Sequence, residues 1–183
     1  MAAIAWRRLF LHGFQVSLSH DTRNNAFLPT DGHLIEASFE KVTGSFKYPR
    51  AEFSLKKYFT HHKRPDGTAG HVSSLAFRAA YTGSNTPICE RFFAGGSFSI
   101  RGFQFRDASP RVYSSHIHDN VSVGGNLEVF VSVEDTFPIM ADVLGVVVFH
   151  DIDTVQPVGN IRDTKCHRAA RGFGLRIRVP AIG

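Results

Sequence analysis

Apolar and polar residues alternate along most of this chain, which is the pattern of β-strands that have one apolar and one polar face. The alternation is clearest near the end, where Arg176 and Arg178 oppose Phe173, Leu175, Ile177 and Val179. Turn-forming residues separate the alternating segments. The pattern predicts about seven strands, in segments 14–20, 34–41, 51–56, 74–81, 123–134, 145–151 and 172–179.

The composition of the two strand faces indicates what lies on each side of the sheet. Val, Leu and Phe occupy one face, whereas Gly, Ser, Glu and Arg occupy the other, and no helical pattern offers a cover for either face. A lipid-facing apolar band around a polar lumen accounts for both. We therefore expect an all-β fold, a transmembrane antiparallel β-barrel in which every backbone polar group is paired within the sheet. A soluble β-sandwich binding module is the alternative.

Composition leaves the class of protein open. The chain has 183 residues, of which 43% are hydrophobic and 20% charged. No apolar run reaches the roughly 18 residues of a transmembrane helix, and the longest is the segment 143–149. Residues 1–10 lack the long apolar region and cleavage site of a secretory signal. A membrane location must therefore rest on strands.

The charge and the cysteines exclude some classes of function. The net charge of +5 and the pI near 9.5 come from Lys and Arg residues scattered among Phe-rich segments, so no basic patch for nucleic acid is predicted. Cys89 and Cys166 lie far apart in the sequence, and both a disulfide and two free thiols stay open. Two cysteines alone do not make a structural zinc site.

Three connections between the strands stand out. Residues 21–32 are dense in turn formers. Residues 60–70 are expected to form a polar loop with a solvated pair, His61 and His62. The segment 83–120 is much longer than a hairpin loop, and such length is usually functional or disordered. Within it, His116, His118 and Asp119 suggest a metal site, but the sequence has no second cluster to complete one, so none is predicted.

An arginine lies at the centre of the long loop, among glycines and aromatic residues in the run 91–106. Gly95 and Gly96 permit a tight reversal of the chain, and Gly102 permits close approach to a neighbouring surface. Phe98, Ile100 and Phe103 can wedge the loop in place. If Arg101 is buried, its guanidinium needs carboxylate partners. The alternative is an ordinary Gly-rich hairpin with a solvated arginine.

The run 92–103 resembles the long-loop segment of the outer-membrane protein assembly factor family, also called the bacterial surface antigen family. Barrels of that family carry a (V/I)RG(F/Y) tip on a loop folded back into the lumen, and here the tip reads Ile100, Arg101, Gly102 and Phe103. The connection 21–32 is similar to the family's D-x-R-(D/N)-N…P-x-x-G segment.

The resemblance also implies partners for Arg101. The family's G-x-N-x-E segment matches Gly124 to Glu128, and its F-x-D segment matches Phe149 to Asp151. By strand parity Glu128 and Asp151 face the lumen, so the resemblance implies that Arg101 folds back against them, with Phe149 beside them. The loop would then be a latch held by buried charge pairs. Solvated lumen charges are the alternative.

The resemblance implies only the carboxyl-terminal part of a barrel, over residues 13–183, after a lead of residues 1–12. About seven strands would leave two open edges in lipid, so we expect the last strands of the barrel to be missing. The family's amino-terminal polypeptide-transport-associated (POTRA) repeats are also absent from the match.

The function implied by the resemblance is insertion of β-barrel proteins into the bacterial outer membrane or translocation of polypeptides across it. The implied partners are the lipid bilayer, unfolded outer-membrane or secreted polypeptides, periplasmic repeats and accessory lipoproteins. No enzymatic activity and no cofactor are expected. A passive pore or surface antigen is the alternative function, and an organelle envelope is the alternative location.

Overall fold

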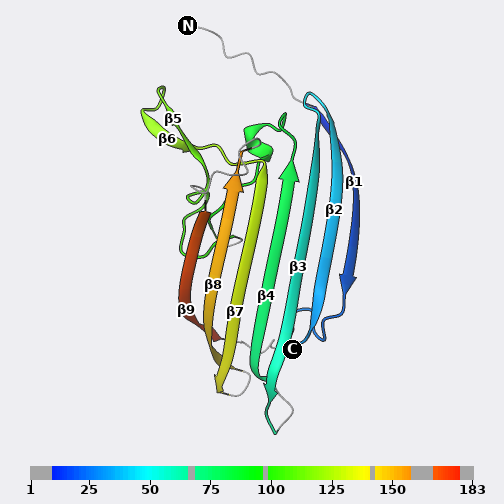
Figure 1. The fold of residues 1–183 in the computed structure, drawn as a ribbon, viewed down its shortest axis with the longest axis vertical. Helices are drawn as coiled ribbons and strands as arrows, with labels where there is room; N and C mark the ends of the chain where they lie inside the picture. Colours follow the sequence, from blue (N-terminus) through cyan, green and yellow to red (C-terminus); the bar gives the residue numbers. More distant parts are fainter. Residues whose placement is uncertain (1–9, 66–68, 97–98, 141–142, 158–166, 178–183) are drawn as a thin grey trace.

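The described part of the chain is one antiparallel sheet with a long loop against one face. The computed structural model describes residues 10–65, 69–96, 99–140, 143–157 and 167–177. The sheet is seven-stranded, in the order β1-β2-β3-β4-β7-β8-β9, and a separate hairpin pairs β5 with β6 (Figure 1). The elements are β1 (Leu11–Asp21), β2 (Gly32–Gly44), β3 (Tyr48–Lys63), β4 (Ala69–Thr82), the 3-10 turn η1 (Ile88–Glu90), β5 (Arg111–Ser114), β6 (Asp119–Ser122), β7 (Leu127–Met140), β8 (Leu144–Gln156) and β9 (His167–Ile177).

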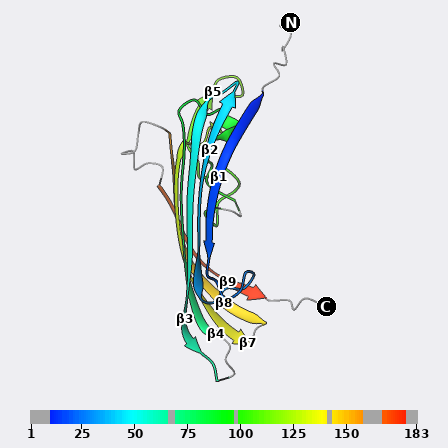
Figure 2. The same ribbon diagram turned by 90° about the vertical axis from the view of Figure 1, so that its right-hand side faces the viewer.

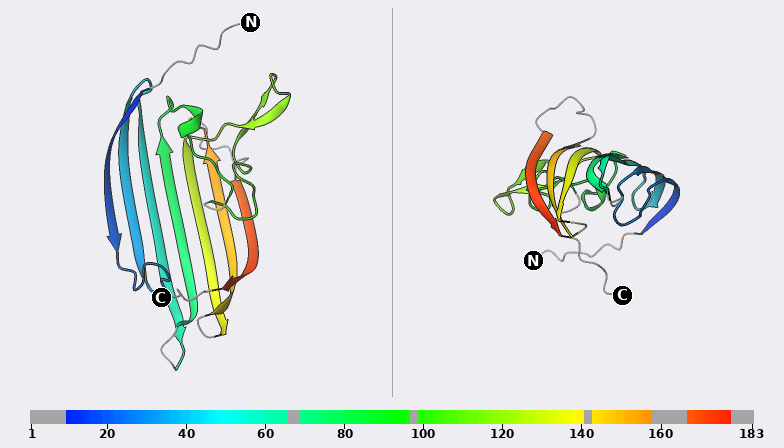
Figure 3. Two further views of the ribbon diagram at one scale, coloured as in Figure 1. Left: turned by 180° about the vertical axis from the view of Figure 1, so that it is seen from behind. Right: turned by 90° about the horizontal axis from the view of Figure 1, so that it is seen from below.

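This architecture confirms the prediction of an all-β, antiparallel, partial barrel of about seven strands. The strands curve together along their length, as the view from the side and the view from below show (Figures 2 and 3). Within the described residues the structure is a single layer, so it lacks the second packed sheet of a sandwich. Among the same residues, no helix is both long and apolar enough to cross a membrane.

The outer face of the sheet is apolar. Cross-strand pairing aligns Leu55, Phe77, Val131 and Ile152 in one row across four strands. Large side chains elsewhere on this face stay exposed, among them Leu18, Phe39 and Phe173. A soluble protein rarely leaves such a wide apolar surface in water, whereas a lipid-facing barrel wall requires it.

The opposite face, here called the inner face, is polar and carries the long loop. Its buried polar residues include Glu128, Ser132, Asp151 and Asp153. A small apolar cluster joins loop residues Ala94, Ile100 and Ala108 to Val155 of β8. The hydrophobic core of the described chain therefore lies between the loop and the sheet, not between two sheets.

Two of the predicted strand boundaries are wrong in a way that changes the connections. Residues 60–63, expected in a loop, continue β3, and Thr60, His62 and Lys63 pair with β4, because backbone groups need partners whatever the polarity of the side chains. The strand expected from Val123 starts at Leu127, because the backbone of Gly125 pairs with Phe92 of the loop instead of with β4.

The predicted long loop also ends later and contains more structure than expected. Strands β5 and β6 form a short hairpin within residues 83–126. Each has only 4 residues, too few for alternation to reveal them. The other strands extend beyond their predicted ends, and residues 178 and 179 of the last predicted strand lie outside the described residues.

Candidate functional site

The long loop is closed at its base by backbone hydrogen bonds. Phe92 and Gly125 donate to each other's carbonyl groups, both at 2.9 Å, and Thr82 donates to the Asn126 carbonyl at 2.7 Å. The buried side chain of Asn126 donates to the Gly83 carbonyl at 2.7 Å. Together these contacts form the loop neck, which brings the loop back to the end of β4 where it began.

The tip of the loop turns on glycine and is anchored by isoleucine. Gly95 has φ 106°, and a Cβ there would lie 2.3 Å from the carbonyl oxygen of Gln104, so only glycine fits without a shift. Gly96 donates its N–H to the Phe103 carbonyl at 3.1 Å. Ile100 is 0% exposed, and Phe103 packs against the same cluster. Phe98 lies outside the described residues.

Arg101 follows Ile100 and reaches the inner face of the sheet. Its Nε donates to Asp151 Oδ2 and its Nη2 to Asp151 Oδ1, both at 2.7 Å. Nη1 donates to Glu134 Oε2 at 2.7 Å, and Nη2 also donates to Ser132 Oγ at 3.0 Å. The guanidinium therefore holds Asp151 of β8 in a bidentate fork, the strong form of a charge-assisted hydrogen bond, and reaches β7 through Glu134 and Ser132.

The two carboxylates, Asp151 and Glu134, also accept hydrogen bonds from groups other than the Arg101 guanidinium. Ser132 donates to Asp151 Oδ1 at 2.6 Å, and the backbone N–H of Arg101 donates to Asp151 Oδ2 at 3.2 Å. Glu134 also accepts from Arg176 of β9 at 2.6 Å. The hydrogen bond to Asp151 is the chief cause that raises the pKa of Arg101 above its ordinary value, so the loop residue stays charged.

Aromatic contact and partial hydration complete the surroundings of Arg101. Its Cζ lies 3.7 Å from the centroid of the Phe149 ring, a cation–π contact. The Asp151 side chain is 0% exposed, whereas that of Arg101 is 34% exposed. Arg101 borders a groove of about 600 Å³ on the inner face, which gives solvent access to one side of the guanidinium.

The structure places Asp151 and Phe149 against Arg101, but it places Glu128 elsewhere. Glu128 accepts from Arg78 of β4 at 2.7 Å. Glu134, six positions further along β7 and on the same face, takes the position expected for Glu128. The expected pairing of Glu128 with Arg101 is therefore wrong, because burial of Ile100 fixes how far along β7 the loop tip reaches.

Sequence reasoning missed Glu134, Ser132 and Asp153. Asp153 is 0% exposed and accepts a hydrogen bond from Ser99 of the loop. Each shares strand parity with a predicted inner-face residue: Ser132 and Glu134 with Glu128 on β7, and Asp153 with Asp151 on β8. Parity could have proposed them as inner-face residues, although not as contacts of the loop.

The remaining candidates lie apart from this site. His116, His118 and Asp119 are exposed on the β5–β6 hairpin. The hydrogen bonds of Arg101 go to other residues, on β7 and β8. Cys89 is an exposed free thiol in η1. Cys166, its possible disulfide partner in the sequence, lies outside the described residues.

Comparison with known proteins gives a consistent result. Residues 7–183 match the model of the Omp85 superfamily domain. The outer membrane protein assembly factor BamA of Neisseria meningitidis serogroup B is 27% identical over 131 residues, which are 70% of this chain and 16% of that protein. The crystal structure of BamA from Haemophilus ducreyi lacking POTRA domains 1–3 aligns with a TM-score of 0.77 at 22% identity, over 92% of this chain and 36% of that one.

The chain therefore spans well under half the length of each of these relatives. The structural likeness establishes the fold, and the family model covers nearly the whole sequence. With the curved antiparallel sheet and the inward loop, these matches show that the chain belongs to the Omp85 superfamily, the family of outer-membrane protein assembly and translocation barrels.

Proposed function

We propose that this chain is the part of a bacterial outer-membrane barrel that assists the insertion of other β-barrel proteins into the membrane, or the passage of polypeptides across it. Family membership supports the general role, and the name of the Neisseria relative, an outer membrane protein assembly factor, supports insertion. Its proposed partners are the lipid bilayer, unfolded outer-membrane or secreted polypeptides, periplasmic repeats and accessory lipoproteins.

One observation carries the proposal: the loop tip is fastened to the inner face through Arg101, Asp151 and Glu134. In a passive pore, such a loop would only constrict the lumen. Here a loop of more than forty positions, residues 83–126, is instead closed at its neck and pinned by a bidentate ion pair to β8. We propose that this latch keeps the sheet beside the loop in one fixed arrangement while clients fold.

The proposed activity requires no chemistry on the client. Burial of apolar side chains and pairing of backbone groups in lipid make client folding favourable without another energy source. We therefore propose a scaffold that lowers the barrier to insertion, rather than an enzyme with a catalytic residue or a cofactor.

Insertion into vesicles tests the proposal. The protein, produced from its complete gene, is reconstituted into lipid vesicles and given an unfolded β-barrel client, whose folding is followed by heat-modifiable gel mobility. We expect faster client folding than in protein-free vesicles, and we expect Arg101→Ala to remove most of that acceleration.

A matched control lies in the same loop. Arg111 forms an ion pair with Asp107 in which both side chains are more than 40% exposed, so Arg111→Ala should leave the acceleration intact. If wild-type protein folds in the vesicles but does not accelerate the client, the insertion proposal fails and a passive barrel takes its place. If both arginine variants act alike, the latch has no role in the activity.

A further inference from the structure

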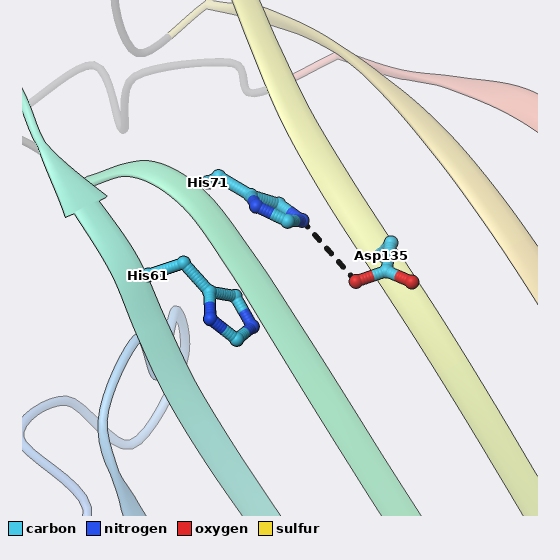
Figure 4. Close-up of side chains that lie close together, drawn as sticks. All are labelled: His61, His71 and Asp135. Atoms are coloured by element: carbon cyan, nitrogen blue, oxygen red, sulfur yellow. Dashed lines mark hydrogen bonds and ion pairs between the residues drawn. The ribbon is translucent and has the colours of Figure 1, made fainter.

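A second group of polar side chains lies outside the Arg101 site, where β3, β4 and β7 run side by side. His61 comes from the end of β3, His71 from the start of β4 and Asp135 from β7 (Figure 4). One ligand atom of each lies within 4.8 Å of those of the other two. Residues 61 and 135 are far apart in sequence, so the sheet alone brings this cluster together.

Strand pairing explains why the side chains converge. Ser73 of β4 pairs directly with Asp135 of β7. Between β3 and β4 the register shifts after Thr60, so that residues 61 and 62 together oppose His71. Such a bulge re-aims a side chain, and here the ring of His61 comes within 4.7 Å, centroid to centroid, of the ring of His71.

Hydrogen bonds link both imidazoles to the carboxylate, His71 directly and His61 through Ser73. His71 Nε2 lies 3.2 Å from Asp135 Oδ1. Ser73 donates its hydroxyl to the same oxygen, and the hydroxyl oxygen lies 2.7 Å from His61 Nε2. Phe137 stacks on His71 at 4.3 Å and 14°, which fixes the plane of that ring. The set is therefore preorganised by one stacked ring and one bridging hydroxyl.

We propose that His61 Nε2, His71 Nε2 and Asp135 Oδ1 form a binding site for a divalent transition metal ion, with Zn²⁺ as the matching example. Two imidazole nitrogens and one carboxylate oxygen are a common ligand set for zinc, with water in the fourth position. Around a tetrahedral ion, donors at about 2.0–2.2 Å lie about 3.3 Å from one another. The His71–Asp135 separation of 3.2 Å already has this value.

The remaining ligand moves little. His61 is exposed, so its ring can rotate toward the ion without displacing a packed neighbour. Each imidazole offers its Nε2 lone pair to the ion in the tautomer that carries the proton on Nδ1. The Ser73 hydroxyl then turns to the carboxylate alone and orients it, as outer partners of metal ligands do.

The location suits capture of an ion from water. Glu134 points to the inner face, so its neighbour Asp135 points to the outer face. The cluster lies near the end of β3 and β4 opposite the long loop (Figure 1), beside the exposed rings of Phe59 and Phe137. Aromatic rings border the apolar band of membrane barrels at the water interface. Side-chain exposures of 29% for His71 and 39% for Asp135 leave the ligand atoms accessible.

A bound ion would join three strands at a place where the ladder between β3 and β4 is irregular. The competing explanation is a hydrogen-bonded His–Ser–Asp group that takes no ion. A direct measurement of zinc binding distinguishes the two explanations, and it does not depend on insertion activity.

The experiment titrates the protein, produced from its complete gene and refolded in detergent micelles, with Zn²⁺ in competition with a chromophoric chelator. We expect one equivalent of zinc per chain. Loss of an outer partner typically weakens zinc binding by about 10- to 100-fold, so Ser73→Ala should fall in that range. His71→Ala and Asp135→Asn, which remove ligands, should weaken binding more than Ser73→Ala does.

The matched control is His20→Ala, which removes one ring of a separate contact, between His20 Nδ1 and His33 Nε2 at 3.1 Å. It should leave the equivalent of zinc unchanged. Gel mobility of each variant confirms that it has folded. Should a variant fail to fold, zinc protection of His61 and His71 from diethylpyrocarbonate, read by mass spectrometry of the wild-type chain, decides the question. Absence of a bound equivalent, absence of protection, or equal binding by wild type and His71→Ala overturns the proposal.

Discussion

Arg101 and Asp151 lie 50 positions apart in the sequence, yet the guanidinium of one contacts both carboxylate oxygens of the other at 2.7 Å. The pair connects the tip of the loop to the middle of β8. Because Asp151 has no exposed side-chain surface, its charge depends on this partner and on Ser132. The loop and the sheet are therefore coupled electrostatically as well as by packing.

Removal of Arg101 should destabilise the folded chain. Loss of one partner of a buried pair costs about 3–5 kcal/mol, and the 34% exposure of Arg101 lowers our expectation to about 2–3 kcal/mol. Arg101→Lys should lose roughly half as much, because an ammonium cannot make the fork. Urea unfolding in micelles, followed by circular dichroism, measures both values. Arg111→Ala serves as the exposed control, and a loss equal to that of Arg101→Ala would contradict the prediction.

Arg101 and Asp151 should couple in a double-mutant cycle. Asp151→Asn removes the charge that Arg101 neutralises, so adding it to Arg101→Ala should cost less than the two separate losses together. We expect a coupling of about 1–3 kcal/mol from the same urea curves. Additive losses would show that the ion pair contributes nothing beyond the packing of Ile100.

The Phe149 ring should contribute through its π face. Phe149→Leu keeps an apolar side chain but loses the cation–π contact at 3.7 Å, which is worth about 1 kcal/mol at a partly exposed site. Phe149→Tyr retains the π face and should cost less. Urea unfolding gives the free energy of unfolding of both variants, and it is repeated in the Arg101→Ala background, where the difference between Leu and Tyr should vanish. A difference that persists there would come from packing.

Two glycines of the loop should differ in their tolerance of alanine. Gly95→Ala meets the Gln104 carbonyl as well as the strain of positive φ, and should cost about 3 kcal/mol. Gly102 has φ 84° but nothing within 4 Å of the new Cβ, so Gly102→Ala should cost only about 1 kcal/mol. Hydrogen exchange of residues 92–96 and 99–110 measures the local effect. A larger effect at Gly102 would show that the loop tip packs differently.

A charge on the outer face should block insertion into lipid. Val133 lies midway along β7 on that face and is 42% exposed. Val133→Arg should cost about 2–4 kcal/mol in a bilayer and should reduce the fraction that refolds in vesicles. Ser74→Arg, which places the same side chain in the inner groove, is the control. Equal refolding of the two variants would argue against a lipid-facing outer surface.

The alternation of residues predicts the sheet well because one buried or lipid-facing side imposes the period on each strand. Alternation fails to predict where the strands end. Residues 60–63 carry polar side chains but still continue β3 against β4, and the strands β5 and β6 are too short to show a period.

The site was predictable only in part, for a geometric reason. Parity states which face Glu128, Glu134 and Asp151 share, but it does not state how far along the strands the loop reaches. That depth follows from the burial of Ile100 against Val155, a tertiary contact. The cluster of His61, His71 and Asp135 was unpredictable for a similar reason, since a bulge and a cross-strand pair create it.

The closed neck of the long loop has a consequence for engineering. Phe92, Gly125 and Asn126 tie the base of the loop together, so an insertion confined to the β5–β6 hairpin should leave the pairing of β4 with β7 in place. The exposed β5–β6 turn can then accept an epitope or a fluorophore-labelling tag. A label at that turn would report loop movement in living cells while the wall of the barrel keeps its alignment.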